Sequence, residues 1–218
     1  RIDINNIFSL NRISSSDTIE SGQSITIGTE YKKTRKNNTK LPENLLELSL
    51  ATVLRDKVES NIPKSTYIGN KRSDVVGHIS FLPNNFFKAN YNFSADNNLD
   101  KLNYNELSAE FRVNNFLSSF KYIEEGGEIG SEHYLQNITS YSLNENNSFS
   151  FSTRRNKKID LTEFYDLIYQ YKNDCLTAAI KYNKEYYSDT DMEPSEQLFF
   201  SLTIVPLGAY ETKSILAN

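Results

Sequence analysis

The sequence has little of several residues that define protein classes. A single cysteine among 218 residues excludes a disulfide-stapled scaffold, and 8 glycines with 5 prolines are too few for a low-complexity repeat. No run of about 18 apolar residues occurs, so we expect no transmembrane helix. Lysine and arginine number 24 against 28 for aspartate and glutamate, and the net charge of −4 argues against a nucleic-acid partner.

Motifs for catalysis and metal binding are also missing. The two histidines, His78 and His133, lie far apart in the sequence, and no HExxH, CxxC, phosphate-loop or GxSxG pattern occurs. We therefore expect no catalytic residue, no metal site and no cofactor, and we do not expect an enzyme. The chain starts at Arg1 and its one methionine is Met192, so we expect a piece of a longer protein.

Aromatic residues are abundant, with 14 tyrosines and 13 phenylalanines, and they sit in segments that alternate apolar and polar residues. Successive side chains of a β-strand point to opposite faces, so each such segment has one apolar and one polar face. The polar positions predict a water-filled lumen lined by Lys88, Asn90, Asn92, Glu106, Glu110, Arg112, Lys181 and Glu185.

The alternation predicts eleven strands, many of about 10 to 14 residues, whereas strands of ordinary globular proteins run about 5 or 6. A tilted strand that spans a membrane needs about 9 to 11 residues, so we predict an all-β fold, an antiparallel up-and-down transmembrane β-barrel. Single-chain barrels usually have an even strand count, so eleven predicts part of a larger barrel. The predicted strands are 21–33, 44–55, 73–82, 86–96, 101–113, 116–124, 132–143, 147–155, 159–171, 174–187 and 196–205.

Short and long connections alternate along the chain. Asn-rich turns at 82–85, 114–115, 144–147 and 172–174 are of the tight hairpin kind, and most of the other connections are longer. An outer-membrane barrel has short periplasmic turns and long external loops, so the pattern favours that class. The connection 34–43 departs from it because it is long where a short turn is due. A soluble β-sandwich also alternates and remains an alternative.

Two single residues carry specific expectations. Cys175 follows the Asn173–Asp174 turn at the expected periplasmic end, and an odd cysteine in an oxidising compartment suggests a disulfide partner outside this chain. Pro206 follows the last predicted strand, and because proline has no N–H to donate, we expect it to end strand pairing there.

Several stretches resemble the LptD family of lipopolysaccharide-assembly proteins. The run from Asn6 to Ser14, NIFSLNRIS, followed by Ser16 to Glu20, SDTIE, is similar to a signature of that family. The YQYKNDC stretch that ends at Cys175 resembles a family strand pair, and SLTIVPLG at 201–208 resembles its closing strand.

The resemblance implies a fold, a location and partners. It implies that residues 1–218 are the C-terminal part of an outer-membrane β-barrel domain, without a complete second domain, in a protein that inserts lipopolysaccharide into the outer leaflet. The implied partners are lipopolysaccharide, an LptE-type lipoprotein plug in the lumen, and periplasmic bridge proteins that bind an N-terminal domain outside this sequence. Cys175 matches the barrel cysteine that bonds to that domain.

The resemblance also implies a lateral gate at the last strand. The gate side formed by this chain consists of Leu198, Phe199, Phe200, Ser201, Leu202, Thr203, Ile204 and Pro206. Other functions remain open, because a porin or solute transporter shares all of the patterning. A secreted β-sandwich binding module and a barrel enzyme such as a lipase are the further alternatives.

Overall fold

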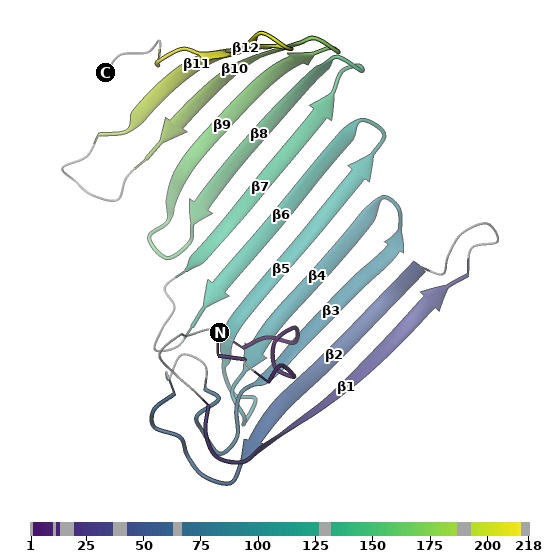
Figure 1. Cartoon of the computed structure of the whole chain (residues 1–218), viewed down its shortest axis with the longest axis vertical. Helices are drawn as coiled ribbons and strands as arrows, with labels where there is room; N and C mark the ends of the chain where they lie inside the picture. The colour runs from purple at the N-terminus through teal and green to yellow at the C-terminus, as the bar shows by residue number, and fades with distance from the viewer. Residues whose placement is uncertain are drawn as a thin grey trace. The chain divides into compact units, whose positions relative to one another are not determined.

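The computed structural model describes residues 2–10, 12–13, 20–36, 43–62, 67–126, 132–186 and 193–214. In these ranges the chain forms one antiparallel up-and-down sheet of 12 strands, each hydrogen-bonded to the next in sequence order (Figure 1). No helix long and apolar enough to cross a membrane is found there. The strands are β1 (Ser24–Arg35), β2 (Glu43–Arg55), β3 (Val75–Asn84), β4 (Phe87–Ala95), β5 (Leu102–Val113), β6 (Phe116–Glu125), β7 (His133–Ser142), β8 (Asn147–Asn156), β9 (Leu161–Lys172), β10 (Leu176–Glu185), β11 (Ser195–Ile204) and β12 (Gly208–Glu211).

The chain divides into two compact units. Unit 1 consists of Arg1–Ser108 and Ile123–Glu132, and unit 2 consists of Ala109–Tyr122 and His133–Asn218.

The all-β fold and the eleven predicted strands are confirmed, with boundaries within a few residues, but a twelfth strand follows them. The prediction that Pro206 ends strand pairing is wrong. Gly208 of β12 pairs with Ile204 of β11, and Glu211 pairs with Ser201. Pro206 lies in the turn between the two strands, where its missing N–H costs no ladder hydrogen bond. Gly208 has a φ of 130°, which glycine adopts readily, and the chain reverses there.

Asparagine side chains shape the short turns. Asn84 Oδ1 accepts hydrogen bonds from the N–H groups of Phe86 and Phe87, both at 2.9 Å. Asn173 Oδ1 does the same for the N–H groups of Cys175 and Leu176, at 3.0 and 2.8 Å. The side chain thus replaces backbone partners that a tight turn leaves unpaired, which is why asparagine marks these positions.

The buried apolar core lies in unit 1. There an N-terminal segment, residues 2–10 and 12–13, and the described parts of the connection between β2 and β3, residues 56–62 and 67–74, pack against one face of the strands. Ile7, Val53 and Ile68 are fully buried. The cluster they belong to consists of Ile2, Ile7, Ile13, Ala51, Val53, Ile62, Ile68 and Val76.

Candidate functional site

One face of the sheet carries large apolar side chains that no other part of the described chain covers. In unit 1, strand register places Leu48 of β2 beside Tyr31 of β1 and Ile79 of β3. Ile25 is 60% exposed and Phe81 40%. We call this surface the apolar face; in unit 1 it consists of Ile25, Ile27, Tyr31, Leu46, Leu48, Leu50, Ile79, Phe81, Tyr91 and Phe93.

The apolar face has the same character in unit 2. Ile180 of β10 lies between Tyr169 of β9 and Phe200 of β11, and Leu167 and Ile180 are each 47% exposed. Aromatic rings contact each other across the strands, as Phe149 and Tyr169 do with ring centroids 5.0 Å apart. The members in unit 2 are Phe149, Phe151, Tyr165, Leu167, Tyr169, Ile180, Tyr182, Leu198, Phe200, Leu202 and Ile204.

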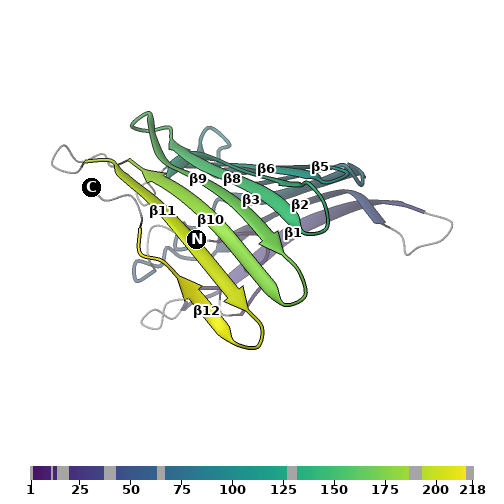
Figure 2. The same cartoon turned by 90° about the horizontal axis from the view of Figure 1, so that it is seen from above.

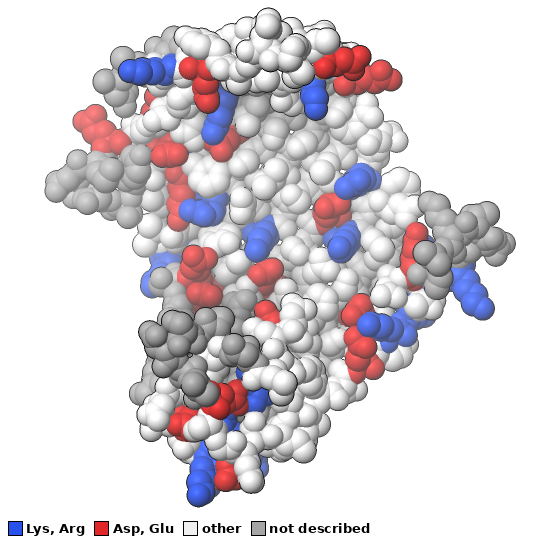
Figure 3. Space-filling model, viewed as in Figure 1, with Lys and Arg blue, Asp and Glu red and all other residues white. Residues whose placement is uncertain are grey.

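The opposite surface, which we call the charged face, carries the polar residues of the same strands. Figure 3 shows Lys, Arg, Asp and Glu side chains distributed over the surface turned toward the viewer. In unit 1 the register places Asn90 beside Ser80 and Asn92 beside His78. Lys88 alternates with these positions along β4 and shares their face.

The other residues predicted to line a lumen also occupy alternate strand positions. Glu106, Glu110 and Arg112 alternate along β5, and Arg112 donates a hydrogen bond to Glu110 at 3.2 Å. Lys181 and Glu185 lie on β10 on either side of Asn183, which donates to Asp166 at 2.6 Å. The register also places Ile168 and Phe199 beside Lys181, so this face in unit 2 is not purely polar.

The two histidines belong to different units, and each bonds a neighbour. His78 Nδ1 lies 2.6 Å from Asn92 Oδ1, and His133 Nε2 lies 3.0 Å from the Tyr122 hydroxyl. These contacts give each imidazole a polar partner of its own.

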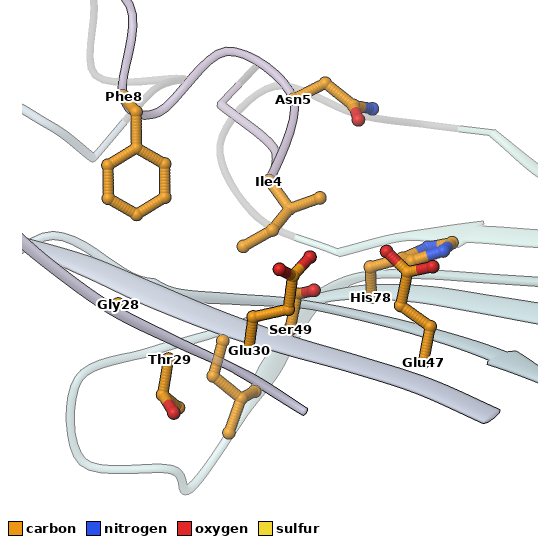
Figure 4. Close-up of a pocket in the computed structure, with 10 residues that line it drawn as sticks. Ile4, Asn5, Phe8, Gly28, Thr29, Glu30, Glu47, Ser49 and His78 are labelled. Carbon is orange, nitrogen blue, oxygen red and sulfur yellow. The ribbon is translucent and has the colours of Figure 1, made fainter. Parts of the chain in front are cut away.

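The N-terminal segment packs on the charged face of unit 1 and leaves a pocket of about 410 Å³ beneath it. Figure 4 shows Phe8 and Ile4 of the segment above the strands and the carboxylates of Glu30 and Glu47 near Ser49 and His78. Gly28 of β1 lies under the Phe8 ring, where a Cβ would come within 2.5 Å of the ring Cζ. A side chain at position 28 would therefore have to displace the tip of the Phe8 ring from its place on the sheet.

Charged residues from the family-like run tie this segment to the strands. Arg12 binds Glu20 through two hydrogen bonds of 2.8 and 2.5 Å, and Arg55 binds the same carboxylate. The Arg55 side chain is 1% exposed and also donates to the carbonyls of Ile68 and Ser21. Burial raises the pKa of Glu20, but the hydrogen bonds and charges of Arg12 and Arg55 more than offset it and hold that pKa below its ordinary value.

The pKa of a second buried carboxylate is shifted in the opposite direction. Asp74, just before β3, is 6% exposed and accepts hydrogen bonds from Ser94 at 2.8 Å and Asn103 at 2.9 Å. Burial raises its pKa more than these two hydrogen bonds lower it, because neither partner carries a positive charge.

A small polar cluster interrupts the large apolar side chains of β6 and β7. The hydroxyls of Ser118 and Thr139 lie 2.8 Å apart, and the Asn137 amide donates to Ser118 at 3.1 Å. Thr139 in turn bonds the Asn137 carbonyl at 3.0 Å. The three side chains thus satisfy one another, which is what polar groups require where water is excluded.

The gate residues lie on β11, the last long strand of the described sheet, except for Pro206 in the turn that follows it. β11 pairs with β10 along its whole length, from Ile204 beside Leu176 to Ser195 beside Glu185. Its other edge pairs with the short β12, which Figure 2 shows lying beside it. Leu198, Phe200, Leu202 and Ile204 lie on the apolar face, whereas Phe199, Ser201 and Thr203 lie on the charged face.

Cys175 is exposed and carries a free thiol in this chain, in the turn between β9 and β10. Its backbone carbonyl accepts a hydrogen bond from the Val205 N–H at 2.8 Å, so it lies at the same end of the strands as the β11–β12 turn.

Two of these features were not predicted from the sequence. The ion pair between Arg12 and Glu20 lies inside the family-like run. The sequence feature that could have predicted it is the presence of two opposite charges eight residues apart. The short strand β12 follows Pro206, and that proline had led us to predict that the sheet ends before it.

An up-and-down antiparallel sheet with one exposed apolar face and one charged face is typical of transmembrane β-barrels. A family model described as LptD, LPS transport system D, matches residues 1–153. No curated protein matches the chain. Because the family match covers more than half of the sequence, the chain belongs to the LptD family. Membership assigns it to LPS transport, in agreement with the family resemblance, and favours that role over a porin, a secreted β-sandwich module or a barrel lipase.

Proposed function

We propose that this chain forms part of the wall of an outer-membrane β-barrel that inserts LPS into the outer leaflet through a lateral gate. β11 and the turn after it form one side of that gate, whose residues are Leu198, Phe199, Phe200, Ser201, Leu202, Thr203 and Ile204 on the strand and Pro206 in the turn. We call the line between β11 and the strand that closes the barrel the seam. Residues 1–218 then belong to the C-terminal part of the barrel domain.

The observation that carries the proposal is the apolar face. Side chains such as Ile180, which is 47% exposed, would contact water if the chain stood alone. Leaving apolar surface in water costs about 25 cal/mol of free energy per Å². Hydrocarbon around the barrel removes this cost. Many of the charged side chains lie on the other face, and Lys184, which lies beside Tyr165 on the apolar face, is next to the end of β10 and pairs with Glu196. This arrangement agrees with a lipid-facing apolar surface, because Lys or Arg at the bilayer midplane costs about 2–4 kcal/mol on the lipid side.

The charged face supports a polar lumen. Lys88, Asn90 and Asn92 on β4 share this face with His78, and Lys181 and Glu185 on β10 share it with Asp166. Such a lining suits the saccharide part of LPS and the surface of an LptE-type lipoprotein plug, since both present hydrogen-bonding groups. Glu106, Glu110 and Arg112 of β5 complete the proposed lining.

Cys175 supports a link to the periplasmic side. Its thiol is exposed in a short turn, where a partner from a periplasmic domain has access to it. We propose a disulfide to that domain, which in turn receives LPS from periplasmic bridge proteins. Cys175→Ser in the full-length protein should abolish a disulfide-linked species on non-reducing gels, and an unchanged pattern would rule the link out.

Photo-cross-linking tests the gate. A benzophenone side chain replaces Phe200 at the seam or Tyr169 on β9 in the full-length protein. Both positions are aromatic, both lie on the apolar face, and both pair with Ile180 from opposite sides. We expect several-fold more LPS adduct at position 200 than at 169 in exporting cells. Equal adducts at the two positions, or none at 200, would contradict the gate.

A further inference from the structure

The chain after β11 turns back and covers the outer edge of that strand. β12 pairs antiparallel with the C-terminal half of β11, placing Gly208 beside Ile204 and Tyr210 beside Leu202. The β12 residues are exposed, Tyr210 to 66%, so they bury little surface there. The pairing holds an edge that would otherwise present free N–H and C=O groups.

Beyond β12 the covering continues, but through side chains. The Thr212 N–H donates to the Phe200 carbonyl at 2.9 Å, as in a regular ladder. The Phe200 N–H, however, donates to the Thr212 hydroxyl at 3.0 Å instead of to a backbone carbonyl. The Leu198 N–H donates to the Ser214 hydroxyl at 3.3 Å.

Thr212 and Ser214 stand where a longer β12 would place its next ladder partners. They are two residues apart, as are Phe200 and Leu198, and they continue the register of Gly208 with Ile204. Their hydroxyls therefore accept the hydrogen bonds that carbonyls of a full-length neighbouring strand would accept. An N–H group in a membrane needs such an acceptor, so the hydroxyls let the edge exist without that strand.

These contacts exclude a second strand at the same edge. Thr212 engages both the N–H and the C=O of Phe200, and a strand paired with Phe200 needs the same two groups. We propose that residues 208–214 form a displaceable latch, which occupies the outer edge of β11 and competes with the antiparallel strand that closes the barrel there. The inference rests on the proposed function, because it assigns a competitor to the seam.

The latch is bound to β11 more weakly than β10 is, so another strand can replace it. β10 pairs with β11 from end to end, whereas the latch pairs by a regular ladder only at Ser201–Ile204 and by hydroxyls beyond it. A closing strand that alternates apolar and polar residues would form backbone bonds along all of β11 and extend the apolar face. Release of the latch therefore accompanies closure of the seam, and its return accompanies opening.

A disulfide lock tests the latch in the full-length protein. Ser201→Cys and Glu211→Cys place two thiols at directly opposed positions, and Ser195→Cys with Glu211→Cys is the mismatched control. We expect the matched pair to cross-link at least tenfold faster than the control. Thr212→Val with Ser214→Ala should slow the matched pair at least threefold, and Thr177→Val on β10, the same chemical change away from this edge, should not. Equal cross-linking of matched and mismatched pairs would overturn the latch.

The same locked protein tests the competition. Oxidation should lower LPS export at least tenfold in the matched pair and leave it unchanged in the mismatched pair. A fast cross-link with undiminished export would overturn the role of the latch at the seam. That outcome is distinct from failure of the proposed function, which appears as absence of LPS adducts at position 200.

Discussion

Gly28 of β1 lies directly beneath the ring of Phe8, and a Cβ at this glycine would come within 2.5 Å of the ring Cζ. This close approach joins two features that the sequence keeps apart: a family-like run at the N-terminus and a strand position on the charged face. The place of the Phe8 ring on the strand thus depends on the absence of a methyl group at position 28.

Gly28→Ala should loosen the N-terminal segment. The added methyl group collides with the tip of the Phe8 ring, so the ring must leave its place on the sheet and its contact with the strand is lost. Hydrogen–deuterium exchange of residues 2–10 in the full-length protein measures the effect. The matched control is the same change in a Phe8→Ala background, where the ring is gone. If Gly28→Ala costs as much there as in the wild type, the contact with Phe8 is not the cause.

Glu20→Gln should strongly destabilise unit 1. The variant leaves Arg12 and the buried Arg55 without their shared negative charge, and breaking a buried ion pair costs about 3–5 kcal/mol. Urea unfolding in lipid measures the loss. Asp160→Asn, which breaks an exposed pair with Arg155 at 2.7 Å, is the control and should leave unfolding nearly unchanged. Similar losses in both variants would refute a special role for Glu20.

The lowered pKa of Glu20 also sets a pH dependence. The folded pKa lies below the unfolded one, so the stabilisation is complete above the ordinary carboxyl pKa and is lost as pH falls through the lowered folded value. The wild type should therefore lose protection of residues 2–10 on acidification. Glu20→Gln should lack this acid-dependent step.

Asp74→Asn should stabilise the protein at neutral pH. Burial raises the folded pKa of Asp74 above its unfolded value, so its contribution is favourable at low pH and is lost as pH rises through the folded value. Asparagine keeps an oxygen that accepts from Ser94 and Asn103 but carries no charge. Unfolding curves at several pH values should show a gain at pH 7 that shrinks on acidification. A loss at neutral pH would contradict this prediction.

Ser118→Val should cost about 0.5–1.5 kcal/mol for each hydrogen bond lost, because the Asn137 amide and the Thr139 hydroxyl each lose one of two partners. The triple variant Ser118→Ala, Asn137→Leu and Thr139→Val removes every member of the cluster at once. It should be close to neutral when unfolding is measured in lipid, since no polar group is stranded. A triple variant less stable than Ser118→Val would show that the cluster itself stabilises the sheet.

Much of the fold was predictable because the strand signal is local. Alternation at Phe87 to Ala95 and at Leu176 to Glu185 fixes which side chains share a face, whatever the neighbouring strand does. The asparagine-rich turns were predictable for the same reason, since Asn84 and Asn173 bond backbone groups two and three residues away. The candidate site was harder to predict from the sequence, because it depends on contacts between residues far apart in the chain. Arg55 meets Glu20 because the pairing of β1 with β2 places Arg55 beside Ser24, at the end of β1 that follows Glu20.

The sequence by itself determined the antiparallel strands, the separation of apolar from charged residues and the family-like run, because each follows from the pleat of the backbone or from adjacent residues. Tertiary structure alone decided that the N-terminal segment packs on the charged face. It also decided that the chain turns at Pro206 and pairs with β11 again, and that Thr212 and Ser214 bond the remaining N–H groups at the edge of β11. The physical reason is that register and loop path, not local alternation, determine which distant groups come within hydrogen-bonding distance.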